Sequence, residues 1–270
     1  GCTDTKRFVV YPQLKLKVEK KKGLDCTPTP NAQIELIASG GEGSSYVLEY
    51  STNGGGIYSP ITLLPGNIFE ATTAGNYIFR LTDTGNPATP SCFVTETLKI
   101  DAIPAITFDT IETNLTCNGS GNGSIKVNVT GGVGPFKFTL TDGTTTWGPQ
   151  DDSEFRDLAA GTNYTVTVQD GTSCTLQENN IVITQPSILN ASASVAPFNC
   201  DPVNNAVRKA IVTVNVTAGT GTGPYKYKFG TATTYDDNNT LSVDSNFTGV
   251  KTINYSVQDA NLCVFNGTVD

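Results

Sequence analysis

Six of the seven cysteines recur at corresponding positions along the chain and could cross-link it through disulfide bonds. Three come early in a repeating unit of about 85 residues, and three come late in it, directly after a strand-like run. The early cysteines are Cys26, Cys117 and Cys200, and the late ones are Cys92, Cys174 and Cys263. A domain of that size has a small core, so covalent cross-links would stabilise it.

The spacing of these cysteines leaves the pairing open among three alternatives. We expect pairs within each unit, namely Cys26–Cys92, Cys117–Cys174 and Cys200–Cys263, which close loops of about 60 residues worth on the order of 4 kcal/mol each. The rival pairs are Cys2–Cys26, Cys92–Cys117 and Cys174–Cys200. If the units stand end to end, an extended path of that length holds the two sulfur atoms tens of Å apart. Free thiols are the third alternative, because connectivity is not encoded in spacing.

Other side chains that could support chemistry are few, and we expect no catalytic residue. The chain contains no histidine, which removes Ser-His and Cys-His pairs and the usual histidine ligands of zinc. A carboxylate pair for glycoside hydrolysis could be sought in a loop beside Gly and Pro, where a solvated turn is the expected role. Those acids are Asp151, Asp152, Glu154 and Asp157.

No metal or other cofactor is expected either. Calcium is the one candidate, because it prefers oxygen ligands and the chain has acidic residues in its turns, but no EF-hand loop is present. The acids concerned are Asp142, Asp151, Asp152, Asp236 and Asp237. A sugar platform would need exposed aromatic residues, and Trp147, Tyr235 and Tyr58 lie in segments predicted to be irregular, where packing or incidental exposure is the expected role.

The late cysteines each follow a strand that opens on a tyrosine and ends on an aspartate. Apolar and polar residues alternate after Tyr77, Tyr164 and Tyr255, which is typical of a half-buried β-strand. We expect each tyrosine to form a tyrosine corner, with its ring in the core and its hydroxyl bonded to the backbone. The aspartates that end these strands should hydrogen-bond their own turns; they are Asp83, Asp170 and Asp259.

Three copies of this pattern predict an all-β protein of tandem immunoglobulin-like β-sandwich domains arranged end to end. The predicted boundaries are 14–103 for repeat 1, 104–186 for repeat 2 and 187–270 for repeat 3. Residues 1–13 are predicted to be the last strand of a truncated preceding repeat, because Cys2 resembles a late cysteine. The chain is therefore expected to be a fragment.

The net charge is −8, and the chain is acidic beyond its first 22 residues. Because phosphate contacts require clustered Lys and Arg, nucleic-acid binding is excluded from the expected functions. No apolar run of 18 residues occurs, so we expect no membrane-spanning helix.

The motifs of repeat 2 resemble the SprB-type repeat, which occurs in very large surface proteins of gliding and other Bacteroidota. They are Thr116-Cys117-Asn118-Gly119, Gly134-Pro135-Phe136, Leu158-Ala159-Ala160-Gly161 and the run from Tyr164 to Cys174. Repeat 3 departs from the pattern at Asp201-Pro202-Val203, and repeat 1 departs at Thr27-Pro28-Thr29-Pro30. Thr110, within Asp109-Thr110-Ile111, is a candidate O-glycosylation site because these residues resemble a motif of the same bacteria.

The resemblance implies a large secreted cell-surface adhesin, extracellular and not an enzyme. Its repeats would serve as an extended stalk and adhesive surface in surface attachment or gliding motility. The implied partners are extracellular polysaccharide or another surface ligand, neighbouring repeats of the same polypeptide, and outer-membrane export or motility machinery. Two alternatives remain: a carbohydrate-binding accessory array of a secreted enzyme, and a purely structural spacer.

Overall fold

The computed structural model describes residues 9–29, 31–42, 45–85 and 92–270. Within these ranges the chain forms 22 β-strands joined by turns and loops, without a helix. No membrane-crossing helix is therefore found in the described part of the chain. The protein is all-β, and its paired strands run antiparallel.

The chain divides into two compact units that interleave along the sequence. Unit 1 comprises Gly1–Phe108, Val129–Lys137 and Val168–Leu176, and unit 2 comprises Asp109–Asn128, Phe138–Thr167 and Gln177–Asp270. Cys2 and the rest of the first eight residues, predicted to belong to a preceding repeat, lie outside the described residues, and 9–14 precede the first strand.

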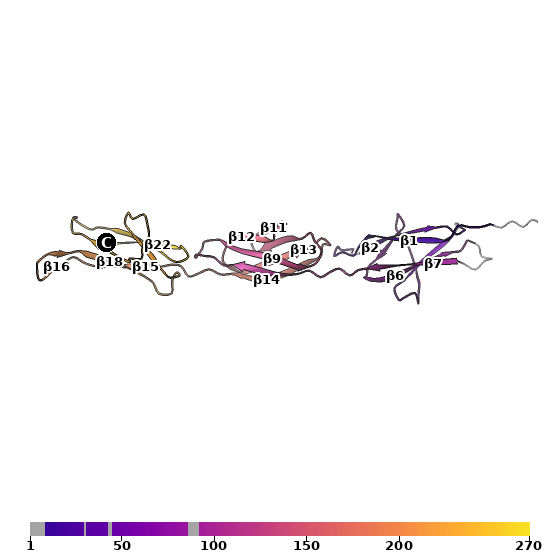
Figure 1. Ribbon diagram of the computed structural model, residues 1–270, viewed down its shortest axis with the longest axis horizontal. Helices are drawn as coiled ribbons and strands as arrows, with labels where there is room; N and C mark the ends of the chain where they lie inside the picture. Colours follow the sequence, from indigo (N-terminus) through magenta and orange to yellow (C-terminus); the bar gives the residue numbers. More distant parts are fainter. Residues whose placement is uncertain (1–8, 30, 43–44, 86–91) are drawn as a thin grey trace, which may run out of the picture. The chain divides into compact units, whose positions relative to one another are not determined.

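Unit 1 contains two complete antiparallel sheets. The first has the order β1-β2-β5 and consists of β1 (Lys15–Lys22), β2 (Ala32–Ser39) and β5 (Ile68–Ala71). The second has the order β4-β3-β6-β7 and consists of β4 (Ser59–Pro60), β3 (Tyr46–Ser51), β6 (Gly75–Asp83) and β7 (Cys92–Ile100). β1, β2, β6 and β7 are labelled in Figure 1.

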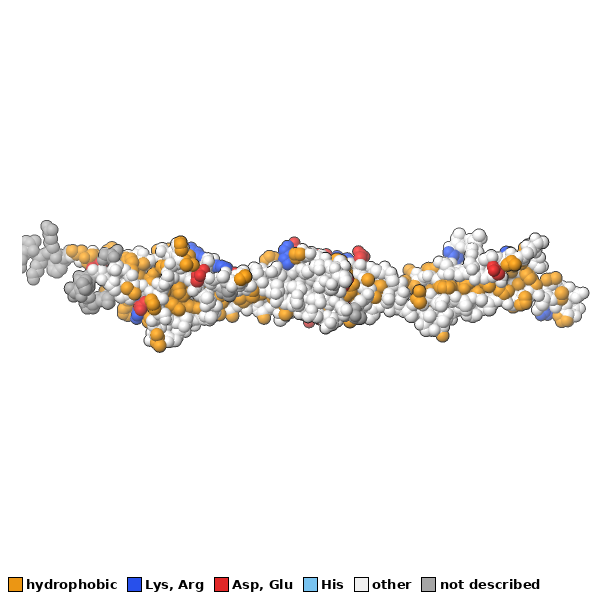
Figure 2. All heavy atoms as spheres, turned by 180° about the vertical axis from the view of Figure 1, so that it is seen from behind, with side chains coloured by type: hydrophobic (Ala, Val, Ile, Leu, Met, Phe, Trp, Pro, Cys, Tyr) orange, Lys and Arg blue, Asp and Glu red, His pale blue; other side chains and the backbone are white. Residues whose placement is uncertain are grey.

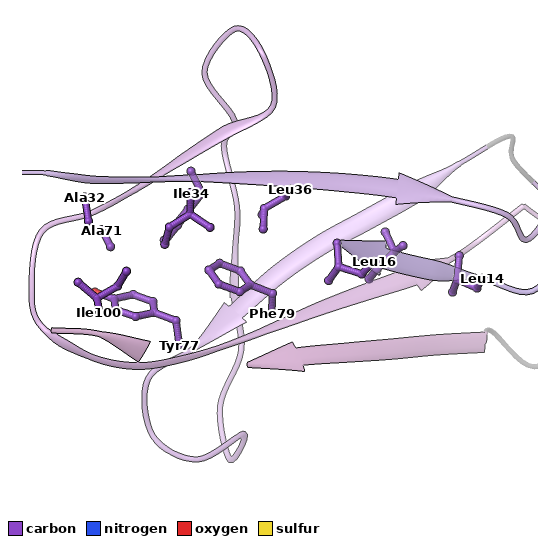
Figure 3. Close-up of a cluster of buried hydrophobic side chains, with 11 residues drawn as sticks. Leu14, Leu16, Ala32, Ile34, Leu36, Ala71, Tyr77, Phe79 and Ile100 are labelled. Atoms are coloured by element: carbon purple, nitrogen blue, oxygen red, sulfur yellow. The ribbon is translucent and has the colours of Figure 1, made fainter. Parts of the chain in front are cut away.

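Alternating side chains of these two sheets meet in one core (Figure 3). Ile34 and Leu36 of β2 are fully buried, as are Phe79 and Leu81 of β6. The ring of Phe69 in β5 lies 5.4 Å from that of Phe79. Each such side chain contributes roughly 1.5–3 kcal/mol by leaving water, so the two sheets form a sandwich.

The same strand order occurs again in the middle of the chain. One sheet has the order β12-β9-β8 and consists of β12 (Glu154–Leu158), β9 (Gly123–Gly131) and β8 (Thr107–Thr113). The other has the order β11-β10-β13-β14 and consists of β11 (Thr146–Gln150), β10 (Lys137–Thr141), β13 (Gly161–Gln169) and β14 (Thr175–Ile183). The alternation in β13 is confirmed, because Tyr164, Val166 and Val168 are buried.

A third occurrence lies within unit 2. Its sheets have the orders β15-β18-β20 and β19-β21-β22, and a short hairpin pairs β16 with β17. The strands are β15 (Ala191–Ala196), β16 (Asn199–Cys200), β17 (Val207–Arg208), β18 (Ala210–Val216), β19 (Lys226–Phe229), β20 (Thr240–Val243), β21 (Ile253–Gln258) and β22 (Val264–Val269). Val214 of β18 packs with Tyr255 and Val257 of β21.

Candidate functional site

Two disulfide bonds connect segments that are far apart in the sequence. Cys26 lies in the connection from β1 to β2, and Cys174 lies in the turn from β13 to β14. The two are bonded across a separation of 148 residues, with their Cα atoms 4.8 Å apart. The backbone amide of Cys26 also donates to the carbonyl of Thr172 at 2.8 Å. Both residues belong to unit 1.

The second bond lies in unit 2 and joins the corresponding elements one predicted repeat later in the sequence. Cys117 lies in the connection from β8 to β9, and Cys263 lies in the turn from β21 to β22. They are separated by 146 residues, and their Cα atoms are 5.6 Å apart. In both bonds, therefore, an early cysteine is joined to the late cysteine of the next predicted repeat.

The expected pairing within repeats is wrong, and so is the rival pairing of successive cysteines. The bonds Cys26–Cys174 and Cys117–Cys263 exclude Cys26–Cys92, Cys117–Cys174, Cys200–Cys263 and every rival pair. Cys92 and Cys200 are free thiols, and both are exposed.

The physical reason is that early and late cysteines of one repeat lie at opposite ends of its strands. Leu14, directly before β1, and the carboxylate of Asp83 both lie next to Gly41, and Asp83 faces Cys92 in the register of β6 and β7. Cys26 follows the other end of β1 and precedes Ala32. Figure 3 shows Leu14 and Ala32 at opposite ends of the core. Eight residues of strand span roughly 26 Å, whereas a disulfide needs Cα atoms within about 7 Å.

Cys174 and Cys263 are each positioned by the aspartate that directly follows the preceding strand. Oδ1 of Asp170 accepts hydrogen bonds from the amide of Thr172 at 2.8 Å, from its hydroxyl at 2.7 Å and from the amide of Cys174 at 3.0 Å. Oδ2 of Asp170 accepts from the amide of Val133 at 3.2 Å. One carboxylate therefore holds the Cys174 turn and ties it to the loop between β9 and β10.

The same arrangement occurs at Asp259. Its Oδ1 accepts from the amides of Asn261 and Cys263, both at 2.9 Å, and its Oδ2 accepts from the amide of Thr222 at 3.0 Å. Leu262, directly before the cysteine, has a φ of 66°, and its counterpart Ser173 has a φ of 65°. The two turns thus share a backbone path as well as a carboxylate cap.

At Asp83 the carboxylate likewise accepts from the amides of two different loops. Oδ2 of Asp83 accepts from the amide of Glu42 at 2.7 Å, and Oδ1 accepts from the amide of Gly85 at 3.0 Å. Asp83 faces Cys92 directly in the register of β6 and β7.

All three aspartates are buried, at 9% exposure or less, and the environment of Asp170 changes its pKa. Burial alone raises the pKa of this carboxyl group, because it disfavours the charged form. The hydrogen bonds from Thr172, Val133 and Cys174 outweigh burial and lower the pKa below its ordinary value. The charged carboxylate is therefore part of the folded turn.

The loops that carry early cysteines are also fixed by local hydrogen bonds. Oδ1 of Asn122 accepts from the amide of Thr116 at 3.2 Å, next to Cys117. The amide nitrogen of Asn118 donates to the carbonyl of Pro186 at 3.0 Å, and the backbone amide of Gly119 donates to the side chain of Gln185 at 2.8 Å. The Asn-Gly pair thus anchors its loop to the segment between β14 and β15, a contact that the sequence did not reveal.

The three tyrosines fill the core at the starts of their strands and are all buried. The hydroxyl of Tyr77 donates to the carbonyl of Thr73 at 2.9 Å, and that of Tyr164 donates to the carbonyl of Ala159 at 3.0 Å. In both cases the acceptor lies four or five residues upstream, which is the bond that the prediction of a tyrosine corner requires. The hydroxyl of Tyr255 instead reaches the carbonyl of Ala191 in β15, at 3.4 Å.

Several of the acidic residues considered for catalysis or calcium, among them Asp142, Asp152 and Glu154, are engaged in local contacts. Arg156 bonds Asp152 at 3.0 Å and Glu154 at 2.5 Å. Oδ1 of Asp142 accepts from the amides of Thr144 and Thr145 in its own turn. In the described ranges, no three His, Cys, Asp or Glu side chains lie together in a way that could hold a metal ion.

The three aromatic residues considered for sugar contact have neighbours of their own. Trp147 lies in β11, not in an irregular segment, and its ring is 6.2 Å from that of Tyr164. The guanidinium of Arg80 lies 3.9 Å from the ring of Tyr58, and the ammonium of Lys228 lies 4.8 Å from the ring of Tyr235. No common aromatic platform is formed by these three residues.

Two further surface features are the edge strand β8 and a hollow in unit 2. Thr110 is half-buried in β8, and its neighbours Asp109 and Ile111 are exposed. The hollow, of about 440 Å³, is lined mostly by apolar side chains, among them Phe198, Phe247 and Val250. Figure 2 shows apolar side chains gathered along the C-terminal part of the chain.

Comparison with known protein families gives a match to a segment that includes most of β8. Residues 110–145, which run from β8 into the turn after β10, match the model of the SprB repeat. The matched segment lies within predicted repeat 2, whose motifs resemble the SprB-type repeat, and it covers only a small part of the chain. No curated protein matches the chain.

Proposed function

We propose that the chain is a tension-bearing stalk and adhesive surface of a secreted cell-surface adhesin, used in surface attachment or gliding. Its sandwiches are immunoglobulin-like domains in tandem, arranged end to end. The match of residues 110–145 to the SprB repeat supports the adhesin class. The two disulfides support an oxidising, extracellular location, since such bonds are rare in the cytosol.

The observation that carries the proposal is that the two disulfide loops overlap. Cys117 lies inside the loop closed by Cys26 and Cys174, and Cys174 lies inside the loop closed by Cys117 and Cys263. A pulling force between the chain ends therefore crosses from Cys26 to Cys174, returns to Cys117, and crosses again to Cys263. All other segments stay slack.

This covalent path limits how far the chain can be extended. It runs through residues 1–26, 117–174 and 263–270, so that roughly 90 residues carry the load, or about 310 Å at ~3.5 Å per residue. Without the bonds the whole chain could extend to about 940 Å. About two thirds of the chain therefore cannot be pulled out while the disulfides are intact. This limit on extension is what a stalk under load requires.

The adhesive role is supported by the family match and by the exposed apolar residues of the C-terminal strands. Extracellular polysaccharide is the proposed ligand, and neighbouring repeats and the export or motility machinery of the outer membrane are the proposed further partners. Tyr58 and Tyr235 are half-buried, and each has a cation over its ring.

The proposed function is tested by bead retention under flow. Beads that carry the oxidised chain on a C-terminal tag should be retained on polysaccharide-coated glass well above beads that carry albumin. Equal retention of both beads would contradict the adhesive role and leave a spacer. Saturable binding of one defined glycan, with retention on that glycan alone, would indicate a carbohydrate-binding array instead.

A further inference from the structure

We infer that the exposed thiols of Cys92 and Cys200 are the two complementary halves of a further disulfide of the same kind. Cys200 takes the late cysteine of another repeat, and Cys92 takes the early cysteine of another. A second copy of this chain presents both partners, so Cys200 of one copy joins Cys92 of the next. This inference extends the proposed function but rests on the disulfides alone, not on adhesion.

Cys92 has the same place in the strand order as the two late cysteines that are bonded. It is the first residue of β7, and Cys174 and Cys263 directly precede β14 and β22. In each case a buried aspartate at the end of the preceding strand accepts a hydrogen bond from a loop amide, as Asp83 does from Glu42. Cys92 itself therefore corresponds to one half of such a bond, and its thiol is free.

Cys92 is more exposed to solvent than Cys174 and Cys263, as expected for a cysteine whose partner loop is absent. Cys174 and Cys263 are half-buried, whereas Cys92 is exposed. A hollow of about 390 Å³ borders Cys92 and is lined also by Pro12, Leu14 and Asp83. At the equivalent turn, the Cys26 loop is in contact through its bond to the carbonyl of Thr172.

Cys200 is the matching half on the other side. It lies in the connection from β15 to β18, as Cys26 lies between β1 and β2 and Cys117 lies between β8 and β9. The hairpin of β16 and β17 pairs Cys200 with Val207. The carboxylate of Asp201 accepts from the amide of Val203 at 2.8 Å and from Arg208 at 3.1 Å, which holds this loop in place.

The two existing bonds set a rule of pairing, because both join an early cysteine to a late one. Cys92 is late and Cys200 is early, so they fit each other, but neither fits a second copy of itself. Such a head-to-tail contact is heterologous, and it generates open chains unless the rotation between copies closes a ring.

The bond forms by thiol–disulfide exchange with a small disulfide such as oxidised glutathione. The thiolate of Cys200 attacks one glutathione sulfur, and one glutathione thiolate leaves. The thiolate of Cys92 then attacks the Cys200 sulfur of the mixed disulfide, and the second glutathione thiolate leaves. Two protein thiols are oxidised, and one glutathione disulfide is reduced to two thiols.

The test mixes two variants of the full chain, both with Cys2→Ser. One carries Cys92→Ser and presents only Cys200, and the other carries Cys200→Ser and presents only Cys92. In a glutathione redox buffer, non-reducing gels and mass spectrometry should show the mixed dimer at least tenfold above either homodimer. Its cross-linked peptides should contain Cys92 and Cys200.

A matched control tests whether the position of Cys200, and not only the exposure of its thiol, determines the yield of mixed dimer. In the Cys200→Ser, Cys92→Ser variant, Val203→Cys places a thiol three residues along the same loop, at a position 92% exposed. This control should give far less mixed dimer with the Cys92 partner. A statistical 1:2:1 distribution of dimers, equal yield from the control, or no mixed dimer would each overturn the inference.

Discussion

Cys117 and Cys263 are 146 residues apart in the sequence, yet their Cα atoms lie 5.6 Å apart and their sulfur atoms are bonded. Cys26 and Cys174 repeat this relationship in unit 1. The two disulfide loops overlap in residues 117–174. Tension applied between the chain ends is therefore carried by this shared segment. Asp170 and Asp259 hold the turns that carry Cys174 and Cys263, so these turns position the cysteines through which the tension passes.

The connectivity itself is the first prediction. Digestion of the oxidised chain without reduction should yield cross-linked peptides that contain Cys26 with Cys174 and Cys117 with Cys263. Cys92 and Cys200 of freshly purified monomer should react with a thiol reagent. Recovery of Cys26 linked to Cys92 would show that the pairing described above is wrong.

Loss of one disulfide should lower the free energy of unfolding substantially. The Cys26→Ser, Cys174→Ser double variant opens a loop of 148 residues, and the chain-entropy model assigns such a loop about 4–5 kcal/mol. Chemical denaturation followed by tryptophan fluorescence measures the change, since the ring of Trp147 in β11 lies 6.2 Å from that of the buried Tyr164 in β13 of the same sheet. The control Cys92→Ser, at a free exposed thiol, should change stability by less than about 0.5 kcal/mol.

The carboxylate of Asp170 should make stability depend on pH in the acid range. Its pKa is lower in the folded chain than the ordinary value of about 3.9 in the unfolded chain, so the folded state favours the charged form. Its contribution is therefore fully present above about pH 4 and is lost as pH falls through the folded pKa. Denaturation curves between pH 2 and pH 7 should show this loss.

Asp170→Asn should remove that part of the pH dependence and destabilise the chain by about 1–3 kcal/mol at pH 7. The new amide group of Asn cannot accept from all the donors that surround the carboxylate, so one N–H is left facing another. Asp237→Asn, at an exposed position, is the matched control and should leave both stability and pH profile unchanged. Identical acid profiles for the wild type and Asp170→Asn would contradict the role given to this turn.

The sandwich of unit 1 predicts a strong contrast between two phenylalanines. Phe79→Ala empties a fully buried site between two sheets and should cost about 3–5 kcal/mol. Phe93→Ala, where the ring is 63% exposed, should cost far less. Urea denaturation of both variants measures the difference, and similar losses at both sites would be incompatible with the core in Figure 3.

The alternation of residues was sufficient to predict the strands, but it did not predict the cross-links. Tyr77, Phe79 and Leu81 are buried in turn along β6, as the period of two requires. Cysteine spacing, in contrast, says nothing about which end of a strand a loop occupies. The antiparallel order of β1 and β2 places Cys26 and Cys92 at opposite ends, and only the three-dimensional arrangement brings Cys174 to Cys26.

Other details depended on contacts between distant segments. Trp147 lies in a segment that the sequence predicts to be irregular, but pairing of β11 with β10 makes this segment a strand. The capping of the late turns by Asp170 was expected from its position, whereas its second bond, to Val133, lies 37 residues away. The sequence therefore predicts hydrogen bonds within a turn, but it does not predict hydrogen bonds between distant segments.

The central claim is tested most directly by stretching single molecules held at residues 1 and 270. With the disulfides intact, we expect full extension near about 310 Å, and after addition of a reductant near about 940 Å. The variant with serine at positions 26, 117, 174 and 263 should match the reduced chain without any reductant. Full extension near 940 Å in the oxidised chain would contradict the interlocked disulfides and the stalk that they define.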